Sequence, residues 1–208
     1  MKTQGSRFVF LLVCVAGAGA AYCYWWRPAP IVNPHPGGSR ILALGDSLTS
    51  GVGASSGHDY VSVLTSKIGR PIVNCGVAGD ATADALARLN RDVLTRDPKI
   101  VIVFLGGNDF LQRVPADQTF ANLDEIVRQV QARGALVVLV EVRPPLAGWQ
   151  YGRRFKRLAR DRGAVLVPNV FRGIFLDPTV KSDEIHFNDR GYAVVAERIH
   201  TAIKPYLN

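Results

Sequence analysis

One serine in this chain follows a short apolar run, at a place where a buried strand is expected to end. Ser47 lies in the Gly-Asp-Ser-Leu segment 45–48, directly after the apolar residues 41–44. In a turn at the end of a strand, a hydroxyl can reach a substrate while backbone N–H groups point outward beside it. The pattern predicts a nucleophile for acyl transfer. The alternative is a strand-to-helix turn in which the serine only caps the helix.

Two further polar segments follow apolar runs in the same way. Gly79 comes shortly after the run 71–75, and Asn108 follows the run 99–105. If the strands form a parallel sheet in the flavodoxin-like order 2-1-3-4-5, both positions converge with Ser47 at one edge. The backbone N–H groups of Ser47 and Gly79 and the amide of Asn108 would then donate to one developing oxyanion.

The sequence Asp-x-x-His at Asp183 and His186 supplies the base that a serine needs. An imidazole can accept the hydroxyl proton during attack, and a carboxylate on its other nitrogen fixes the tautomer. Ser47, Asp183 and His186 are therefore predicted to form a catalytic triad, although Asp-x-x-His alone is more often a helix cap or surface polarity. Three carboxylates beside these motifs are predicted to fix the turns as hydrogen-bond acceptors: Asp46, Asp80 and Asp109.

Short apolar runs alternate with segments of helical period throughout residues 40–208. The runs are too short for helices and are rich in Val, Ile and Leu, as strands buried on both faces should be. They lie at 40–44, 71–75, 99–105, 135–140 and 164–167. This pattern predicts an α/β fold with three layers, in which helices cover both faces of a five-stranded parallel sheet of flavodoxin-like order.

The N-terminal part has a different character. An uncharged run over 8–26 follows Lys2 and Arg7, and as a helix it would just cross a bilayer. Residues 1–27 are predicted to be a membrane anchor, with a cleaved signal peptide as the alternative. A Pro- and Gly-rich linker is predicted over 28–39. The charges before the run place the following domain in the periplasm or another extracytoplasmic space.

Composition limits the remaining function classes. The 208 residues carry a net charge of +8, and the three cysteines have neither disulfide nor metal-site spacing. We therefore expect one domain after the linker, with no metal and no cofactor. The basic residues form no nucleic-acid recognition motif, so nucleic acid is not expected as a partner. Anionic lipid headgroups are the favoured counterpart of the excess charge.

Taken together, the motifs around Ser47, Gly79, Asn108 and His186 resemble those of the GDSL, or SGNH, hydrolases, over nearly the whole of the expected domain. The resemblance implies the SGNH hydrolase fold, a serine nucleophile, two further oxyanion donors and a histidine base at these four positions. It implies that Asp183 orients the base. The likeness is greatest to the periplasmic thioesterase and lysophospholipase members of the family.

One departure from the family pattern is Phe187, since the family usually has proline after the histidine of this motif. This residue could reshape the substrate pocket. Candidate substrate-binding residues are apolar or aromatic side chains near the motifs, and the alternative is that they only cover the edge of the sheet. They are Phe110, Pro145, Trp149, Tyr151 and Phe187.

The predicted function is hydrolysis of carboxylic esters or thioesters, either acyl esters of the lysophospholipid type or small aryl and alkyl esters. The predicted partners are such ester substrates and, through the N-terminal segment, a membrane. Two alternatives stay open at this point. The chain could remove O-acetyl groups from cell-envelope glycans, or it could be a membrane-anchored binding module without catalysis.

Overall fold

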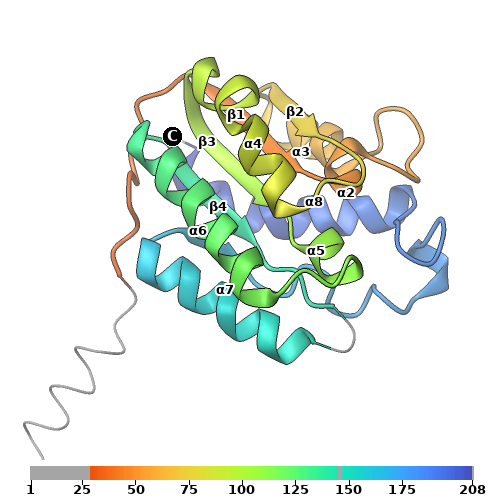
Figure 1. Cartoon of the computed structure of the whole chain (residues 1–208). Helices are drawn as coiled ribbons and strands as arrows, with labels where there is room; N and C mark the ends of the chain where they lie inside the picture. Colours follow the sequence, from red (N-terminus) through yellow and green to blue (C-terminus); the bar gives the residue numbers. More distant parts are fainter. Residues whose placement is uncertain (1–28, 145–146, 208) are drawn as a thin grey trace, which may run out of the picture. The chain divides into compact units, whose positions relative to one another are not determined.

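A computed structural model describes residues 29–144 and 147–207 (Figure 1). The predicted anchor over 1–27 and the candidate Pro145 lie outside the described residues. Among the residues that are described, no helix has both the length and the apolar character needed to cross a bilayer. The chain divides at Pro30, and the buried core of the described residues lies entirely in the unit from Ile31 onward.

Five parallel strands form one sheet in the order β2-β1-β3-β4-β5, as the spacing of apolar runs predicts. They are β1 (Arg40–Gly45), β2 (Ile72–Gly76), β3 (Pro98–Phe104), β4 (Leu136–Val140) and β5 (Val165–Val167). Apart from Arg40 and Lys99 near their starts, the interior strands β1, β3 and β4 are apolar because both faces of the sheet are covered. In the register, Ile41 of β1 lies between Ile72 and Ile100, so the first three strands start at the same edge.

Helices cover both faces of this sheet (Figure 1). On one face, helix α3 packs against α8. On the other face, α4, α6 and α7 lie side by side. The α-helices are α2 (Ser47–Ser50), α3 (Tyr60–Ile68), α4 (Thr82–Asp92), α5 (Gly107–Leu111), α6 (Ala116–Ala132), α7 (Gly148–Arg162) and α8 (Asp189–Ile203). Three short 3-10 helices are η1 (Leu94–Arg96), η2 (Pro178–Val180) and η3 (Lys204–Tyr206). The three-layer α/β fold is thus confirmed.

The helix α6 illustrates why these segments fold as they do. Its residues Leu123, Ile126, Val127 and Val130 recur every three or four positions, which places them on one side of the helix. All four are completely buried against the sheet. Burying each such side chain contributes roughly 1.5–3 kcal/mol, so the apolar stripe determines which side of the helix faces the core.

Residues 31–39 of the predicted linker lie against the domain. The amide of Asn33 donates to the carbonyl of Ala135 at 3.0 Å, just before β4. The backbone N–H of Val32 donates to the carbonyl of Gly163 at 2.8 Å, just before β5. This stretch therefore runs along the edge of the sheet where the strands begin.

Candidate active site

The turn that carries Ser47 is built by its neighbours. The carboxylate of Asp46 caps α2 by accepting a hydrogen bond from the Leu48 N–H at 3.0 Å. A side chain at Gly45 would collide with Thr49, since an added Cβ would stand 1.9 Å from its hydroxyl. The close packing of this turn therefore requires glycine at the end of β1, and Ser47 becomes the first residue of α2.

The structure brings the three residues of the predicted triad into contact. Ser47 Oγ lies 2.9 Å from His186 Nε2, and His186 Nδ1 lies 2.7 Å from Asp183 Oδ2. The other oxygen of Asp183 accepts the backbone N–H groups of Ile185 at 2.8 Å and His186 at 2.7 Å. Backbone and imidazole donors together hold the pKa of Asp183 well below its usual value. Because this carboxylate only accepts, Nδ1 carries the hydrogen and Nε2 is left to accept from Ser47.

A buried aromatic ring fixes the loop that presents the histidine. Phe187 is completely buried, and its ring packs near those of Phe171 and Tyr192 at centroid distances of 5.6 and 6.0 Å. The backbone N–H of Ser182 donates to the carbonyl of His186 at 3.1 Å, which closes the loop on itself. Phe187 was predicted to contact substrate, but its ring lies in the core, where it packs against Phe171 and Tyr192.

The predicted oxyanion donors lie around the serine. Ser47, Gly79, Asn108 and His186 line one open pocket of about 280 Å³. Gly79 has φ +90°, a backbone conformation that glycine adopts readily. The Asn108 amide donates to the carbonyl of Asp80 at 3.0 Å, which orients it. Among the described residues, the backbone N–H groups of Ser47 and Gly79 donate no hydrogen bond, so both remain available to a ligand.

A largely buried arginine that the sequence reasoning missed ties two of these turns together. Arg88 on α4 donates through Nε to Asp80 Oδ2 at 2.6 Å and through Nη2 to the carbonyl of Gly45 at 3.1 Å. The two charged side chains are only 9% and 11% exposed. The sequence contains one indication of this role. Arg88 follows Ala85 by three positions and precedes Leu89, which places its charged side chain near the buried side of an amphipathic helix.

The other two aspartates beside the motifs accept hydrogen bonds from α4 rather than from their own turns: Asp80 from Arg88, and Asp109 from Thr82. Asp109 is completely buried and accepts from Thr82, through its N–H at 2.9 Å and its hydroxyl at 2.5 Å. Asn122 on α6 in turn donates to the Thr82 hydroxyl at 3.0 Å. This network fastens α5, which carries Asn108, to α4 and α6.

Burial of Asp46 changes its acid strength. The loss of hydration raises the pKa of this carboxyl to about 6, and the hydrogen bond from Leu48 N–H opposes the rise only in part. Asp46 Oδ2 also lies 3.5 Å from the Asn108 amide nitrogen. A buried carboxylate therefore stands directly behind the serine and one of the predicted oxyanion donors.

The predicted aromatic contacts do not line the pocket. Tyr151 is buried between Phe110 and Phe120, with ring centroids 6.0 and 5.4 Å away. Trp149 is exposed and stacks against the guanidinium of Arg153 at 3.7 Å. Phe110 and Tyr151 thus pack in an aromatic cluster of α5, α6 and α7, and Trp149 covers the exposed surface of α7.

Aliphatic side chains next to the motifs form the apolar wall of the pocket instead. Val52, Leu111 and Ile185 line it, and each is 38% or more exposed. Sequence reasoning missed all three, although Leu111 follows Asn108 by one helical turn and Ile185 precedes His186 directly. Within the described part of the chain, no three His, Cys, Asp or Glu side chains lie close enough to bind a metal ion.

Comparisons with known proteins agree with this architecture. The model of the GDSL-like lipase/acylhydrolase family matches residues 43–194. The chain is 30% identical to the thioesterase 1/protease 1/lysophospholipase L1 of Escherichia coli K12 over 179 residues, which cover 81% of this chain and 85% of the relative.

Solved structures extend the likeness to three dimensions. The crystal structure of a protein named TesA superposes with a TM-score of 0.75 at 27% identity, over 81% of this chain and 99% of that one. The psychrotrophic esterase EstA from Pseudoalteromonas sp., solved with monoethylphosphonate as inhibitor, gives 0.72 at 27% identity over 81% and 98%. With its sheet order and its motifs at the strand ends, the chain belongs to the GDSL-like lipase/acylhydrolase family and is a hydrolase of the esterase and thioesterase type.

Proposed function

We propose that the chain hydrolyses carboxylic esters and thioesters with Ser47 as nucleophile, His186 as general base and Asp183 as the group that orients the imidazole. The observation that carries this proposal is the continuous contact from Ser47 Oγ to His186 Nε2 at 2.9 Å and from Nδ1 to Asp183 at 2.7 Å. A serine hydroxyl is a weak nucleophile at neutral pH, and this arrangement removes its proton at the moment of attack.

The reaction then proceeds in two acyl transfers. Ser47 Oγ forms a bond to the ester carbonyl carbon while its proton passes to His186 Nε2, and the carbonyl π electrons move onto oxygen. Collapse of this intermediate breaks the bond to the alcohol or thiol, which leaves with the proton from His186. Water repeats the same steps on the acyl-serine and releases the acid and free Ser47.

Three donors would stabilise the oxyanion. They are the Ser47 and Gly79 N–H groups and the Asn108 amide. This amide donates to the Asp80 carbonyl at 3.0 Å and to Asp46 Oδ2 at 3.5 Å, and the oxyanion would replace the longer of these two bonds. Such donors, fixed before the reaction, stabilise charge that develops only in the transition state. The positive φ of Gly79 lets its backbone approach the substrate without a side chain in between.

For the substrate, we propose an acyl ester whose chain lies along Val52, Leu111 and Ile185. These side chains give the pocket an apolar wall beside the reacting serine. The E. coli relative is named a thioesterase and lysophospholipase, which supports acyl thioesters and lysophospholipids as the classes to test. Small aryl and alkyl esters should also fit, because the pocket is open on one side.

We also propose that the domain works outside the cytoplasm, held at the inner membrane by residues 8–26 or released there after cleavage. The support is the uncharged run preceded by Lys2 and Arg7. Membrane fractionation of cells that express the full chain, with protease added to intact spheroplasts, tests this placement. Protection of the domain from protease would contradict it.

A fluorophosphonate probe tests the catalytic proposal directly. Attack by Ser47 Oγ forms an O–P bond and expels fluoride, as expected for a serine hydrolase. We expect one labelled site, loss of labelling and of p-nitrophenyl ester turnover in Ser47→Ala, and no loss in Ser66→Ala, an exposed serine on α3. Full turnover in Ser47→Ala would refute the mechanism, and an unlabelled native protein would revive the non-catalytic binding module.

A panel of esters and thioesters of graded chain length tests the substrate class. The apolar wall predicts that kcat/KM rises from acetyl to longer acyl groups, by about threefold to fivefold for each buried methylene until the wall is covered. A preference for acetyl esters would instead support the O-acetyl esterase alternative. Leu111→Ser should flatten the rise, because it removes apolar surface from the wall.

A further inference from the structure

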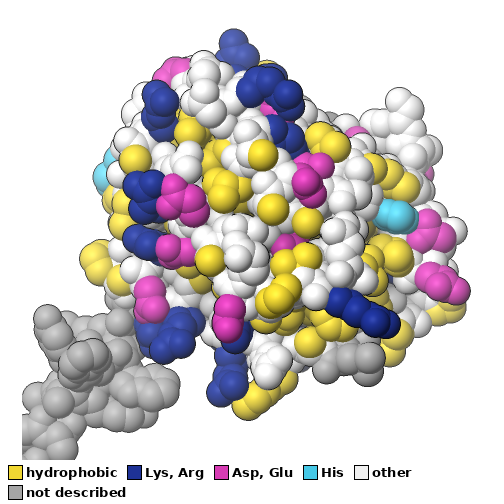
Figure 2. Space-filling model, viewed as in Figure 1, with side chains coloured by type: hydrophobic (Ala, Val, Ile, Leu, Met, Phe, Trp, Pro, Cys, Tyr) yellow, Lys and Arg dark blue, Asp and Glu magenta, His cyan; other side chains and the backbone are white. Residues whose placement is uncertain are grey.

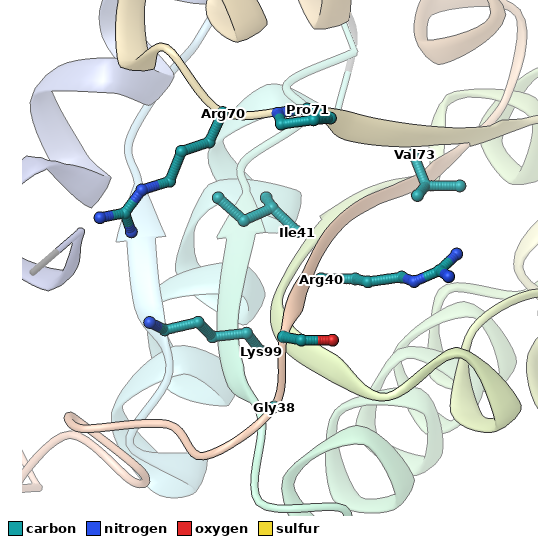
Figure 3. Close-up of a pocket in the computed structure, with 8 residues that line it drawn as sticks. Gly38, Arg40, Ile41, Arg70, Pro71, Val73 and Lys99 are labelled. Atoms are coloured by element: carbon teal, nitrogen blue, oxygen red, sulfur yellow. The ribbon is translucent and has the colours of Figure 1, made fainter.

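A second and larger pocket lies at the opposite edge of the sheet, where the strands begin (Figure 3). Its volume is about 510 Å³. Arg70 and Lys99 extend on one side of β1 and Arg40 extends on the other. The residues that line it come from the starts of β1, β2 and β3: Gly38, Ser39, Arg40, Ile41, Arg70, Pro71, Val73 and Lys99.

The three cations of this pocket have no carboxylate partner. Within residues 29–144 and 147–207, neither Arg40, Arg70 nor Lys99 forms an ion pair. Asp97 lies at the same edge, and its carboxylate accepts the Ser39 N–H at 3.1 Å. Arg70 uses Nη1 to donate to the carbonyl of Leu207 at 2.6 Å, which leaves its remaining N–H groups available.

Interaction with a helix C-terminus explains the position of other basic residues at this edge, but not that of Arg40, Arg70 or Lys99. Lys67 and Arg162 lie in the last turns of α3 and α7, where cations interact favourably with the helix dipole. Each of those two also has a carboxylate partner. By contrast, Arg40 and Lys99 lie within strands and Arg70 precedes one, so no helix end accounts for their charge. Figure 2 shows Lys and Arg at the top of the molecule, toward the strand starts in Figure 1, whereas on the left side they alternate with Asp and Glu.

Only a short stretch of sequence separates the predicted membrane segment from the residues held at this edge. Because residues 31–39 are held along the strand starts, only five Cα steps separate Trp26 from Ile31, or about 18 Å when fully extended. The N–H of Val32 donates to the carbonyl of Gly163, just before β5. From β5 to β1 there are three strand spacings across the sheet, or about 14 Å. If residues 8–26 occupy a bilayer, the length of the intervening chain allows this edge to reach its headgroups.

We propose that this edge docks on an anionic phospholipid surface, with headgroup phosphates bound by Arg40, Arg70 and Lys99. Guanidinium and ammonium groups bind phosphate oxygens well, and the pocket is wide enough for a headgroup. Its lining contains no aromatic side chain on which a base could stack, so it does not have the character of a single-strand nucleic-acid site. The proposal does not depend on the reaction at Ser47.

This docking orients the enzyme. The strands are parallel, so Ser47 at their carboxyl ends lies at the edge opposite to Arg40. With the strand starts on the headgroups, the reactive pocket opens away from that membrane. The substrate then arrives from the aqueous phase rather than from the bilayer to which the domain is docked.

Sedimentation with lipid vesicles tests the proposal. The chain from Ile31 onward is suitable because it contains the whole buried core, and its melting curve and ester turnover verify that it is folded. We expect it to bind vesicles containing about one third phosphatidylglycerol far better than pure phosphatidylcholine, and to be released by about 500 mM salt. The variant Arg40→Gln/Arg70→Gln/Lys99→Gln should bind about a hundredfold more weakly.

The matched control removes equal charge elsewhere. Arg153, Lys156 and Arg157 are exposed on α7, so their combined change to Gln should reduce vesicle binding less than fivefold. Equal losses in the two triple variants would overturn the proposal, as would equal binding to neutral and anionic vesicles. Two further results would overturn it. One is that millimolar inorganic phosphate stabilises the protein while vesicles do not bind. The other is that the protein binds DNA but not lipid, and that the variant of Arg40, Arg70 and Lys99 no longer binds DNA.

Discussion

The two edges of the sheet differ in what they offer to a ligand. At the edge where the strands end, Ser47, Gly79 and His186 come from three separate turns and surround one small pocket. At the edge where the strands begin, Arg40 and Lys99 line a larger basic pocket and belong to the strands themselves. The edge with Ser47 presents hydrogen-bonding groups in fixed directions, whereas the edge with Arg40 presents positively charged side chains that few contacts hold in place. Parallel topology thus separates chemistry from electrostatic attraction within one small domain.

The largest expected effect lies at the imidazole. His186→Ala should lower kcat for a soluble ester by about 10⁴-fold or more, because no other side chain in the described part of the chain is hydrogen-bonded to Ser47 Oγ. Asp183→Asn should approach the same loss, since an amide can favour the wrong tautomer. Steady-state kinetics on p-nitrophenyl butyrate measures both, with His58→Ala as control. A loss below tenfold in His186→Ala would contradict the assigned base.

The oxyanion donor comes next. Asn108→Ala should lower kcat by about a hundredfold to a thousandfold with little change in KM, because the lost hydrogen bond acts mainly in the transition state. Asn90, which is exposed on α4, provides a control of the same residue type. Its change to Ala should leave kcat within about threefold. Equal effects of the two changes would argue against an oxyanion role for Asn108.

Arg88 positions the turns without touching the pocket. Arg88→Met leaves Asp80 buried without its partner, and we expect a loss of about 3 kcal/mol in the free energy of unfolding and a fall of about tenfold in kcat. Arg88→Lys should restore part of the stability but less of the kcat, because one ammonium cannot reach both Asp80 and Gly45. The control Arg91→Met lies on the exposed side of α4 and should change neither quantity appreciably.

Asp46 should give the stability of the protein a pH dependence at acidic pH. Its pKa rises from 3.8 in the unfolded chain to about 6 in the fold, so the folded state binds the proton more tightly. This contribution is complete below pH 4 and is lost as the pH rises through 6, by up to about 3 kcal/mol. Urea unfolding at several pH values should show this slope in the native chain and a smaller one in Asp46→Asn. An unchanged slope in the variant would assign it to another group.

The smallest effect is expected from the basic edge. Changing Arg40, Arg70 and Lys99 together to Gln should alter kcat/KM for a soluble ester by less than about twofold, because the charges are remote and screened by salt. A large loss of turnover with a normal melting temperature would show that the two edges are not independent.

Prediction from sequence succeeded where local pattern and topology determine position. The apolar runs specified the strands, and the rule that parallel strands end at one edge brought Ser47 and His186 together although 139 residues separate them. It failed for side chains whose surroundings come from distant segments. Nothing adjacent in the sequence indicates that Phe187 enters the core or that Arg88 bonds to the end of β1. The aliphatic wall of the pocket could not be predicted for the same reason. Leu111 looks like any leucine in a helix, and only the position of the neighbouring loops shows that it lines the pocket.

The burial of Phe187 has a consequence for inactivation by heat. The histidine loop is exposed at Asp183, yet the residue after His186 is held by the same core that supports the sheet. The backbone at His186 therefore stays in place as long as the Phe187 ring remains in the core. Activity and global structure should therefore disappear at one temperature, without an earlier stage in which a folded but inert enzyme accumulates.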